Sequence, residues 1–300
     1  MTQKMKKNIL LVGGCGYIGT FLYSKLLDSD CSVVVCDNLK RGNPLKIDLI
    51  NKDYADLGEL ELTNYDTVLW FAGHSSVPLS TIDPEGALKN NCLNLYSFAQ
   101  RLPDTTKLIY ASSASLYSSR AEHTPYSSEE SLVNIPSQNP YDISKFAFDY
   151  MAKGFLKNFY GLRMGTLSGY SPNLRSELVF NAMNISAQKK GIVTLRNATS
   201  NRTILFLDDL WVLIRQLIFL DYPPGFINAG SINCNLGQLA HQIADVWEAK
   251  VADEGNSETY SFLLDTSLMK NICGNNLKRR DFSEECHDFL IKLEAMNGKL

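Results

Sequence analysis

The sequence contains no hydrophobic run that is long enough to cross a bilayer. The longest apolar stretch, residues 210–220, is interrupted by Arg215 and Gln216, whereas a transmembrane helix needs about 20 mostly apolar residues. The apolar run near the N-terminus ends at Gly13, too early to form the core of a secretory signal. We therefore expect a cytoplasmic protein with no membrane partner.

Cysteine and histidine are too scattered to indicate a disulfide framework or a metal site. The seven cysteines are odd in number and include no C-x-x-C pair, and the four histidines form no ligand set. Cys15, Cys36 and Cys92 lie in apolar or glycine-rich segments, and we expect them to be small core residues. The net charge of −3 and the lack of a long basic run give no indication of nucleic-acid binding.

Strand and helix signals alternate through the first half of the chain. Apolar stretches predict strands near residues 8–13, 31–37, 66–72 and 106–112, and helical periodicity predicts helices near 17–28, 84–101 and 141–158. Almost continuously apolar strands, such as residues 67–71, are typical of a parallel sheet covered on both faces. The pattern predicts an α/β fold with a doubly wound parallel sheet.

A glycine-rich turn follows the first predicted strand. Gly13, Gly16 and Gly19 form the pattern G-x-x-G-x-x-G before a helix that starts near Tyr17. Such glycines permit a tight turn and let a pyrophosphate approach the N–H groups at the helix start. Strand, turn and helix together predict a dinucleotide site, and the alternative is a plain glycine-rich loop.

An acidic residue ends the second predicted strand. Asp37 lies 18 residues beyond Gly19. A carboxylate there can accept hydrogen bonds from the adenosine ribose and repel a 2′-phosphate, so that NAD is favoured over NADP. Lys40 and Arg41 follow and leave NADP as an alternative.

Tyr141 and Lys145 are four residues apart in the string NPYDISK. On a helix, this spacing places both side chains on one face. A tyrosine hydroxyl has a pKa near ~10, and a nearby ammonium stabilises the phenolate and lowers that pKa. The pair is therefore a candidate general acid/base.

The sequence resembles the extended short-chain dehydrogenase/reductase family, in particular its nucleotide-sugar epimerase/dehydratase branch. The segments that carry the likeness are GGCGYIG, VVVCDNLKRGN, DTVLWFAGHSSV, KLIYASSASLY and NPYDISK, in the family's order. The resemblance implies a Rossmann domain that binds NAD over residues 1–168. Residues 169–300 are then expected to form mainly a smaller substrate-binding lobe, with some segments returning to the Rossmann sheet. The polar stretch 113–139 is expected to be a long functional loop.

The resemblance also implies residue roles. Ser113 matches the catalytic serine or threonine, Tyr141 is the acid/base, and Lys145 binds the nicotinamide ribose. The expected cofactor-binding residues are Gly13, Gly16, Tyr17, Ile18, Gly19, Asp37, Asn38, Asp56, Leu57, Ala72 and Gly73. The expected substrate-binding residues are Ser76, Val77, Thr166, Leu178 and Arg202, the last at the place of an arginine that pairs with the diphosphate. Alternatives remain open for Asp56–Leu57 (a helix cap and a core leucine), Ala72–Gly73 (a strand-end turn) and Leu178 (an amphipathic helix residue).

The sequence departs from the family at positions that matter for the reaction. The Asp-Glu pair with which 4,6-dehydratases eliminate water is replaced by Ala114 and Ser115. The nearby glutamate of decarboxylases is missing, and Ala114 stands where relatives that epimerise at an acidic carbon have a cysteine. Thr166 occupies a position that is often Asn in epimerases. Redox chemistry at one carbinol remains.

We therefore expect an NAD-dependent nucleotide-diphosphate-sugar 4-epimerase that removes a hydride transiently, with Tyr141 as acid/base. A nucleotide-4-keto-sugar reductase or dehydrogenase is the alternative in the same class. A non-catalytic protein that senses NAD is the alternative outside it, and the joint presence of Ser113, Tyr141 and Lys145 argues against it. The resemblance also implies a homodimer formed through helices that include residues 84–101 and 141–158.

Overall fold

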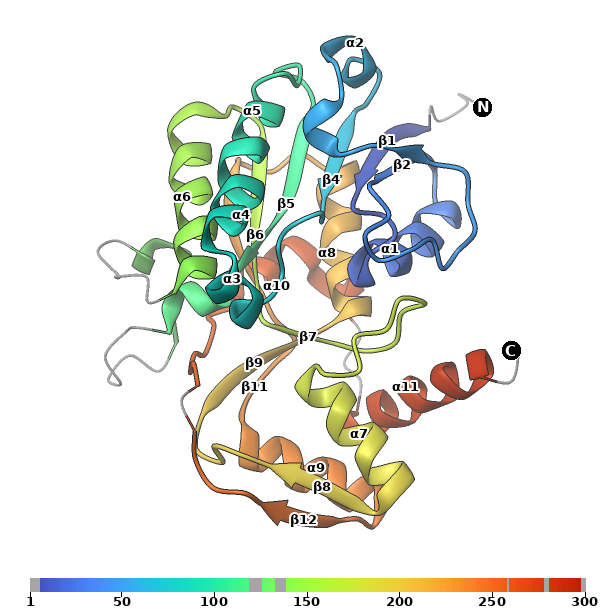
Figure 1. The fold of residues 1–300 in the computed structure, drawn as a ribbon, viewed down its shortest axis with the longest axis vertical. Helices are drawn as coiled ribbons and strands as arrows, with labels where there is room; N and C mark the ends of the chain where they lie inside the picture. The colour runs from blue at the N-terminus through green and yellow to red at the C-terminus, as the bar shows by residue number, and fades with distance from the viewer. Residues whose placement is uncertain (1–5, 119–125, 133–138, 258, 278–280, 298–300) are drawn as a thin grey trace.

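A seven-stranded parallel sheet forms the upper part of the molecule (Figure 1). The computed structural model describes residues 6–118, 126–132, 139–257, 259–277 and 281–297. The strand order is β10-β6-β5-β4-β1-β2-β3, and every neighbouring pair is parallel. The strands are β1 (Lys7–Val12), β2 (Cys31–Asp37), β3 (Ile50–Asn51), β4 (Thr67–Trp70), β5 (Lys107–Ser113), β6 (Phe159–Met164) and β10 (Gly225–Ala229). The order reverses between β1 and β4, and ligands of such sheets bind beyond the carboxyl ends of the strands at this point.

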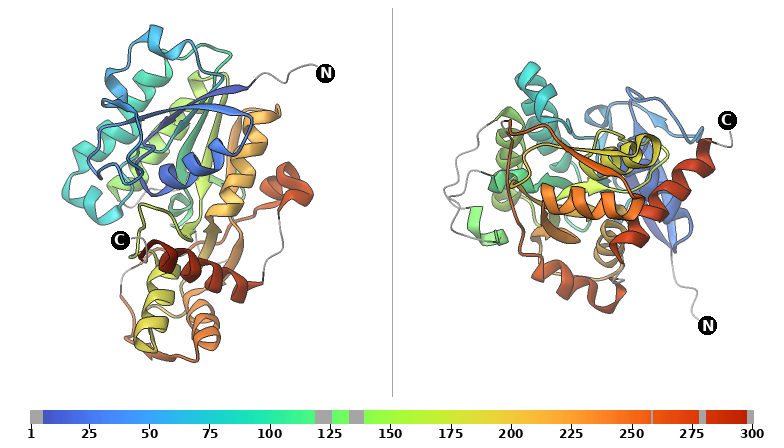
Figure 2. Two further views of the ribbon diagram at one scale, coloured as in Figure 1. Left: turned by 90° about the vertical axis from the view of Figure 1, so that its right-hand side faces the viewer. Right: turned by 90° about the horizontal axis from the view of Figure 1, so that it is seen from below.

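The strands are apolar on both faces because helices cover both faces. Ile9 and Leu11 of β1 pack with helices α1 (Tyr17–Leu27), α8 (Leu207–Phe219) and α10 (Ser267–Cys273). Leu10 and Val12 pack on the opposite face with α5 (Leu95–Ala99) and α6 (Pro140–Phe155). Successive side chains of a strand point to opposite faces, and Figure 2 shows the resulting layers. The predicted α/β fold with a doubly wound parallel sheet is confirmed.

The helical segment over residues 84–101 is not regular. It consists of α4 (Pro84–Leu88), a π-helical segment η2 (Lys89–Asn94) and α5. Because a π-helical turn contains an extra residue, it changes which side chains face the sheet, and such turns are frequent at functional sites. Two amides of η2 bind the backbone after β4: Asn90 Nδ2 donates to Ala72 O at 3.0 Å, and Asn91 Nδ2 donates to His74 O at 3.0 Å. The helix predicted near residues 84–101 is confirmed over residues 84–99, with a π-helical stretch in its middle that the sequence did not indicate.

The lower part of the molecule has its own small sheets and core. β7 (Thr166–Ser168), β9 (Asn201–Phe206) and β11 (Ile232–Asn235) form a three-stranded sheet, and β8 (Ile192–Leu195) pairs with β12 (Lys250–Asp253). Helices α7 (Val179–Lys190), α9 (Leu236–Trp247) and α11 (Phe282–Asn297) surround a core centred on Phe180. The ring of Phe180 contacts the rings of Phe206, Phe282 and Phe289 edge-on. The division of function at residue 168 stays a prediction.

The stretch between β5 and α6 is only partly irregular. It begins with the 3-10 helix η3 (Ala114–Tyr117) and includes a second one, η4 (Glu129–Leu132). Residues 119–125 and 133–138 of the predicted loop lie outside the described residues.

All seven cysteines are free, and Cys15, Cys36 and Cys92 are buried as predicted. Within the described ranges, no helix has the length and apolar character needed to cross a membrane.

Candidate active site

The glycine turn between β1 and α1 is closely packed and leaves a helix start uncapped. Gly13 has φ +80°, and a Cβ there would lie 2.6 Å from Ala72 N. A Cβ at Gly19 would lie 2.2 Å from Gly13 O, so the helix approaches the turn as closely as its backbone permits. Gly16 is the N-cap of α1, and no side chain caps this end of the helix. The first N–H groups of α1 are thus available to an anion, and this end of the sheet fits a dinucleotide pyrophosphate.

Asp37 lies beside this turn at the end of β2. Its carboxylate accepts hydrogen bonds from Cys15 N at 2.9 Å and Leu39 N at 2.8 Å. These bonds fix the carboxylate next to the turn, and because a carboxylate has about four acceptor sites, it can still accept from ribose hydroxyls. The neighbouring Asn38 is exposed and donates to Asp53 Oδ2 at 3.1 Å. The geometry fits an adenosine ribose at Asp37.

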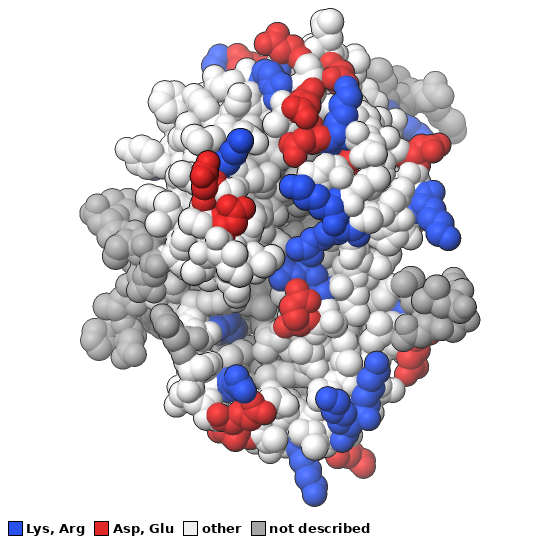
Figure 3. All heavy atoms as spheres, in the orientation of Figure 1, with Lys and Arg blue, Asp and Glu red and all other residues white. Residues whose placement is uncertain are grey.

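Basic side chains gather near the mouth of this site. Figure 3 shows Lys and Arg side chains near the middle of the displayed face, around the hollow between the upper and lower parts. The pKa of His74 is lowered, mainly by burial; the charge of Asp83 opposes this shift, and the charges of Lys145, Arg41 and Lys40 add to it. A positive potential at this place attracts the phosphates of a dinucleotide.

Two predicted cofactor residues of α1 turn their side chains elsewhere. The Tyr17 hydroxyl donates to Gly169 O at 2.6 Å, and only 5% of the residue is exposed. Ile18 is partly buried against the core on this face of the sheet. Tyr17 can therefore meet a cofactor only through its backbone, and its hydroxyl ties α1 to the segment that follows β7.

The other predicted cofactor residues divide into two groups. Leu57 is 1% exposed and belongs to the core, whereas Asp56 is exposed and ends a short 3-10 turn whose N-cap is Asp53. The core alternative therefore describes the Leu57 side chain. Ala72 and Gly73 follow β4, and a Cβ at Gly73 would lie 2.8 Å from Lys145 Nζ. The backbone after β4 thus directly adjoins the predicted catalytic helix.

Ser113, Tyr141 and Lys145 come together at the carboxyl end of β5. Ser113 is the last residue of β5, and the other two lie in the first turns of α6. The helix start is fixed by Asn139, whose side chain accepts from Asp142 N at 2.9 Å, and by Pro140 in the first turn. Lys145 Nζ donates to Ala111 O at 2.8 Å and lies 5.8 Å from the centre of the Tyr141 ring. The Ser113 side chain is a hydrogen-bond partner of the Tyr141 phenol.

Burial determines the acid–base properties of this group. Burial lowers the pKa of Lys145 to about 7, and the Asp149 carboxylate partly opposes the shift. Burial raises the pKa of Tyr141 to about 12, the hydrogen bond with Ser113 lowers it, and the charge of Asp142 raises it. The expectation of a lowered Tyr141 pKa is therefore wrong for this structure. The physical reason is that the Lys145 ammonium donates to Ala111 O and lies 5.8 Å from the centre of the Tyr141 ring. Desolvation, in contrast, acts on the phenol directly.

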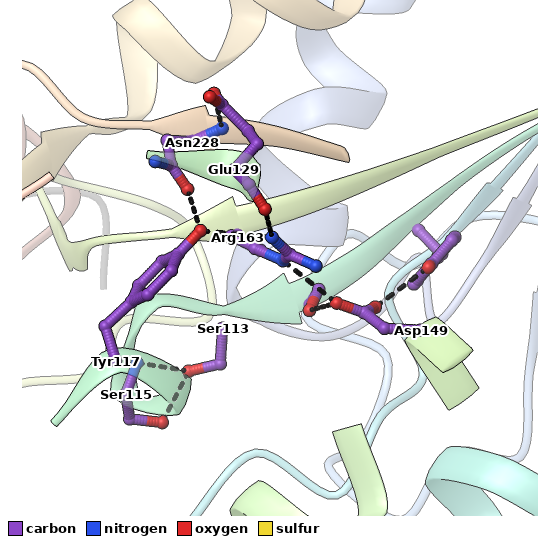
Figure 4. Close-up of polar contacts among 9 residues, drawn as sticks. Ser113, Ser115, Tyr117, Glu129, Asp149, Arg163 and Asn228 are labelled. Atoms are coloured by element: carbon purple, nitrogen blue, oxygen red, sulfur yellow. Dashed lines mark hydrogen bonds and ion pairs between the residues drawn. The ribbon is translucent and has the colours of Figure 1, made fainter. Parts of the chain in front are cut away.

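A buried polar network supports the catalytic residues from the sheet side (Figure 4). Arg163 Nε lies 3.0 Å from Asp149 Oδ2, and the two residues are 3% and 2% exposed. Asp149 also accepts from Tyr110 and Ser112, and Arg163 also donates to the Tyr117 hydroxyl and to Glu129 O. The network joins β5, β6 and α6 to the 126–132 segment.

Sequence reasoning missed a carboxylate next to Ser113. The Ser115 hydroxyl donates to Asp142 Oδ1, and the Ser113 and Ser115 hydroxyl oxygens are 2.8 Å apart. The sequence departure at Ala114 and Ser115 had indicated that no carboxylate serves this place. The only sequence signals were an acid directly after Tyr141 and a serine at position 115, and neither reveals the contact.

The predicted substrate residues lie on or next to different helices and strands. Ser76 caps α3 (Val77–Ile82), Val77 is the first residue of that helix, Thr166 begins β7, and Leu178 precedes α7. Arg202 in β9 is 5% exposed. Its guanidinium donates to Thr259 Oγ1 at 2.7 Å and to Tyr260 O, and it lies 4.2 Å from the centre of the Tyr260 ring. Burial lowers the pKa of Arg202.

The sequence matches a family model over residues 9–229, that of the NAD dependent epimerase/dehydratase family. The chain belongs to this family. It is an NAD-dependent enzyme of the extended short-chain dehydrogenase/reductase type, as predicted.

Several relatives are similar in sequence or in structure. A UDP-glucose 4-epimerase of Halalkalibacterium halodurans is 28% identical over 56% of this chain and 53% of its own length, so the chain spans about half of that relative. A putative UDP-glucose 4-epimerase of Methanocaldococcus jannaschii is 24% identical over 88% of this chain and 92% of its own length. The solved UDP-N-acetylglucosamine 4-epimerase of Methanobrevibacter ruminantium has a TM-score of 0.81 at 23% identity, covering 98% of this chain and 100% of its own. The NDP-hexosamine 5,6-dehydratase TunA has a TM-score of 0.80 at 20% identity, with 97% and 98% covered.

Proposed function

We propose that this enzyme is a nucleotide-diphosphate-sugar 4-epimerase. The observation that carries the proposal is the junction of the catalytic helix with the cofactor edge of the sheet. Lys145 Nζ lies where a side chain at Gly73 would begin, and Ser113 and Tyr141 adjoin it. An acid/base set at this place acts on a carbinol that faces the nicotinamide ring. The names of the relatives, several of them 4-epimerases, support the same reaction.

The residues divide the reaction between them. NAD held by the glycine turn and Asp37 would supply the hydride acceptor for the sugar carbon. Tyr141 takes the carbinol proton as the hydride leaves and gives it back when the hydride returns. Ser113 is proposed to hold the sugar hydroxyl beside the Tyr141 oxygen, and Lys145 is proposed to hold the nicotinamide ribose. Because each group acts on charge that develops at the sugar oxygen, the set lowers the barrier in both directions.

The lower part of the molecule is proposed to bind the nucleoside diphosphate. Arg202 is the proposed diphosphate ligand, because a buried guanidinium forms bidentate, charge-assisted bonds to phosphate. Binding would replace its bonds to Thr259 Oγ1 and Tyr260 O. Ser76, Val77, Thr166 and Leu178 are the proposed sugar and base contacts. This division assigns the cofactor to residues 1–168 and most substrate contacts to residues 169–300.

We also propose a homodimer. Large apolar side chains are exposed on the side of α3–α6: Ile82 is 80% exposed, Leu93 54%, Tyr150 75% and Phe155 66%. These helices pack side by side and leave one outer face. Tyr150→Glu is expected to give a monomer in light scattering, whereas Ile291→Glu on α11, also exposed, is expected to leave the assembly unchanged. An unchanged Tyr150→Glu assembly would contradict the interface.

Mass spectrometry and a turnover assay on the purified enzyme test the reaction. Small molecules released by denaturation are expected to include NAD, and UDP-sugars are expected to interconvert at C4 without added cofactor. Tyr141→Phe is expected to lower turnover by about 100-fold or more while NAD stays bound. Stoichiometric consumption of added NADH or NADPH would instead identify a 4-keto-sugar reductase. Unchanged turnover in Tyr141→Phe would remove Tyr141 from the mechanism.

A further inference from the structure

Two serine hydroxyl groups lie between the predicted catalytic tyrosine and a buried carboxyl group. The Tyr141 phenol is a hydrogen-bond partner of Ser113, and the Ser113 and Ser115 oxygens are 2.8 Å apart. The Ser115 hydroxyl donates to Asp142 Oδ1. Figure 4 shows Ser113 and Ser115 side by side at the end of β5. The hydrogen bonds from Ser113 to Asp142 are therefore continuous, and Ser113 is the member of this chain that influences the Tyr141 phenol.

A helix-capping role accounts for only one of the two oxygens of the Asp142 carboxylate. Oδ2 accepts from Asn139 Nδ2 at 2.7 Å, which belongs to the capping arrangement at the start of α6. Oδ1 points the other way and accepts from Ser115. Asp142 is 2% exposed, and no cation pairs with it among the ion pairs that the structure describes. An acid in the first turn of a helix has no need of either burial or Ser115 to favour the helix dipole.

The hydrogen-bond directions form a proton path. Ser115 has one proton and donates it to Asp142, so the proton between Ser113 and Ser115 comes from Ser113. Ser113 is then left as an acceptor for the Tyr141 hydroxyl. When the carboxyl is protonated, the three bonds reverse, and Ser113 donates to the Tyr141 oxygen. The two directions are the two ends of one proton transfer.

We propose that Asp142 is a positioning residue that stores the proton which Tyr141 removes from the sugar, through Ser115 and Ser113. As the hydride leaves the carbon, the Tyr141 oxygen gains the carbinol proton while its own O–H bond breaks and Ser113 gains that proton. Ser113 passes its own proton to Ser115, and Ser115 passes its own to Asp142 Oδ1. Tyr141 is a phenol before and after the relay, and the Asp142 carboxylate becomes a neutral carboxyl group, so protons and charge balance. The return of the hydride reverses every step. The proposal rests on Tyr141 as the acid/base of the proposed function.

The surroundings of Asp142 suit this storage. Burial raises the pKa of its carboxyl group, and hydrogen bonds from Ser115 and Asn139 lower it. The elements packed against α6 also bring other titratable groups, namely Glu85, Lys89, Tyr96, Lys107, Tyr110 and Tyr117. On α6 itself, these groups are Tyr141, Lys145, Asp149, Tyr150 and Lys153. The shift of Asp142 is attributed to burial and the two hydrogen bonds rather than to any of these charges.

Variants of Ser115 and Asp142 test the path in the full-length enzyme. Ser115→Ala and Asp142→Asn are expected to lower turnover about 10- to 100-fold with little change in KM. Ser115→Thr keeps a hydroxyl and is expected to restore most of the rate. Thr106→Val is the matched control, because it removes a buried hydroxyl that bonds Tyr65 O at 2.9 Å just before the start of β5. Equal rates for Ser115→Ala and wild type, or equal losses in Ser115→Ala and Ser115→Thr, would overturn the path.

Two further readouts separate proton storage from mere support. The wild-type kcat/KM is expected to fall at low pH, because protonation of Asp142 blocks the path. Asp142→Asn is expected to show no such fall, and the same fall in both proteins would contradict the proposal. Infrared difference spectra are expected to show a protonated carboxyl band, missing in Asp142→Asn and shifted in Ser115→Ala, and spectra without such a band would also contradict it. If Tyr141→Phe abolishes turnover while the Ser115 and Asp142 variants behave as wild type, the storage fails and the 4-epimerase proposal stands. If no sugar is turned over, the infrared result still tests the path.

Discussion

The ammonium of Lys145 lies over the indole ring of Trp70, 5.1 Å from the ring centroid. Trp70 ends β4 and is fully buried, and its indole N–H finds no partner among the described residues. The ring therefore contributes its face and not its N–H. A cation over an aromatic face is stabilised most by tryptophan and more strongly when it is desolvated. We infer that Trp70 helps to keep Lys145 charged in a site that otherwise favours the neutral amine.

Replacing Trp70 is expected to shift the pH dependence of the reaction. Burial already lowers the pKa of Lys145 to about 7, and Trp70→Leu is expected to lower it further, because the cation–π attraction is lost. The fall in kcat/KM that accompanies deprotonation of Lys145 should then begin at lower pH, while Trp70→Phe should show a smaller shift. The matched control is Trp247→Leu, which removes an indole of α9 whose Nε1 donates to Asn184 Oδ1 at 2.9 Å. Superimposable profiles for Trp70→Leu and wild type would show that the ring is only packing.

The low pKa of Lys145 also makes stability depend on pH. The pKa is lowered from 10.5 to about 7 in the folded protein, so the unfolded chain binds more protons between these values. The free energy of unfolding therefore rises with pH across this window, and the penalty of burying the cation is complete below it. Relative to Lys145→Met, wild type is expected to gain roughly 3 kcal/mol between pH 7 and 9.5.

Urea unfolding at pH 6.5, 8 and 9.5 measures this difference. The pH range stays below the titration of Tyr141, whose pKa is raised to about 12. Lys153→Met on the exposed side of the same helix is the control, and its difference from wild type should not vary with pH. A constant difference between wild type and Lys145→Met would mean that Lys145 keeps its usual pKa.

The parts of the site that sequence predicted are those with local rules. The glycine turn, Asp37 at the end of β2, and the spacing of Tyr141 and Lys145 each follow from backbone geometry or helix period within a short segment. The parts that were missed are contacts between distant segments. Ser115 meets Asp142 across 27 residues, and Arg202 meets Tyr260 across 58. The π-helical stretch inside the helix predicted over residues 84–101 was missed for a related reason, because Asn90 and Asn91 bind the backbone after β4.

Breaking the buried ion pair is expected to destabilise the fold strongly. Arg163→Met leaves the Asp149 carboxylate buried without its cation, which costs about 3–5 kcal/mol in comparable cases. Asp149→Leu combined with Arg163→Met removes both charges, and the double variant should lose less than the sum of the two single losses. Urea unfolding of the four proteins gives the coupling energy. Additive losses would show that the two side chains do not support each other.

One glycine substitution is expected to weaken NAD binding, and another is expected to stabilise the fold. In Gly19→Ala the new Cβ would lie 2.2 Å from Gly13 O and 2.6 Å from Gly14 Cα, both backbone atoms. The turn must open, and NAD affinity should fall by about tenfold or more, at least ~1.4 kcal/mol. In Gly154→Ala the new Cβ meets nothing within 4 Å on the exposed side of α6, and the better helix former should stabilise the protein by about 0.5–1 kcal/mol. Calorimetric titration with NAD and thermal unfolding of both variants measure the two effects. Wild-type NAD affinity in Gly19→Ala would mean that the dinucleotide does not depend on this close approach of α1 to the turn.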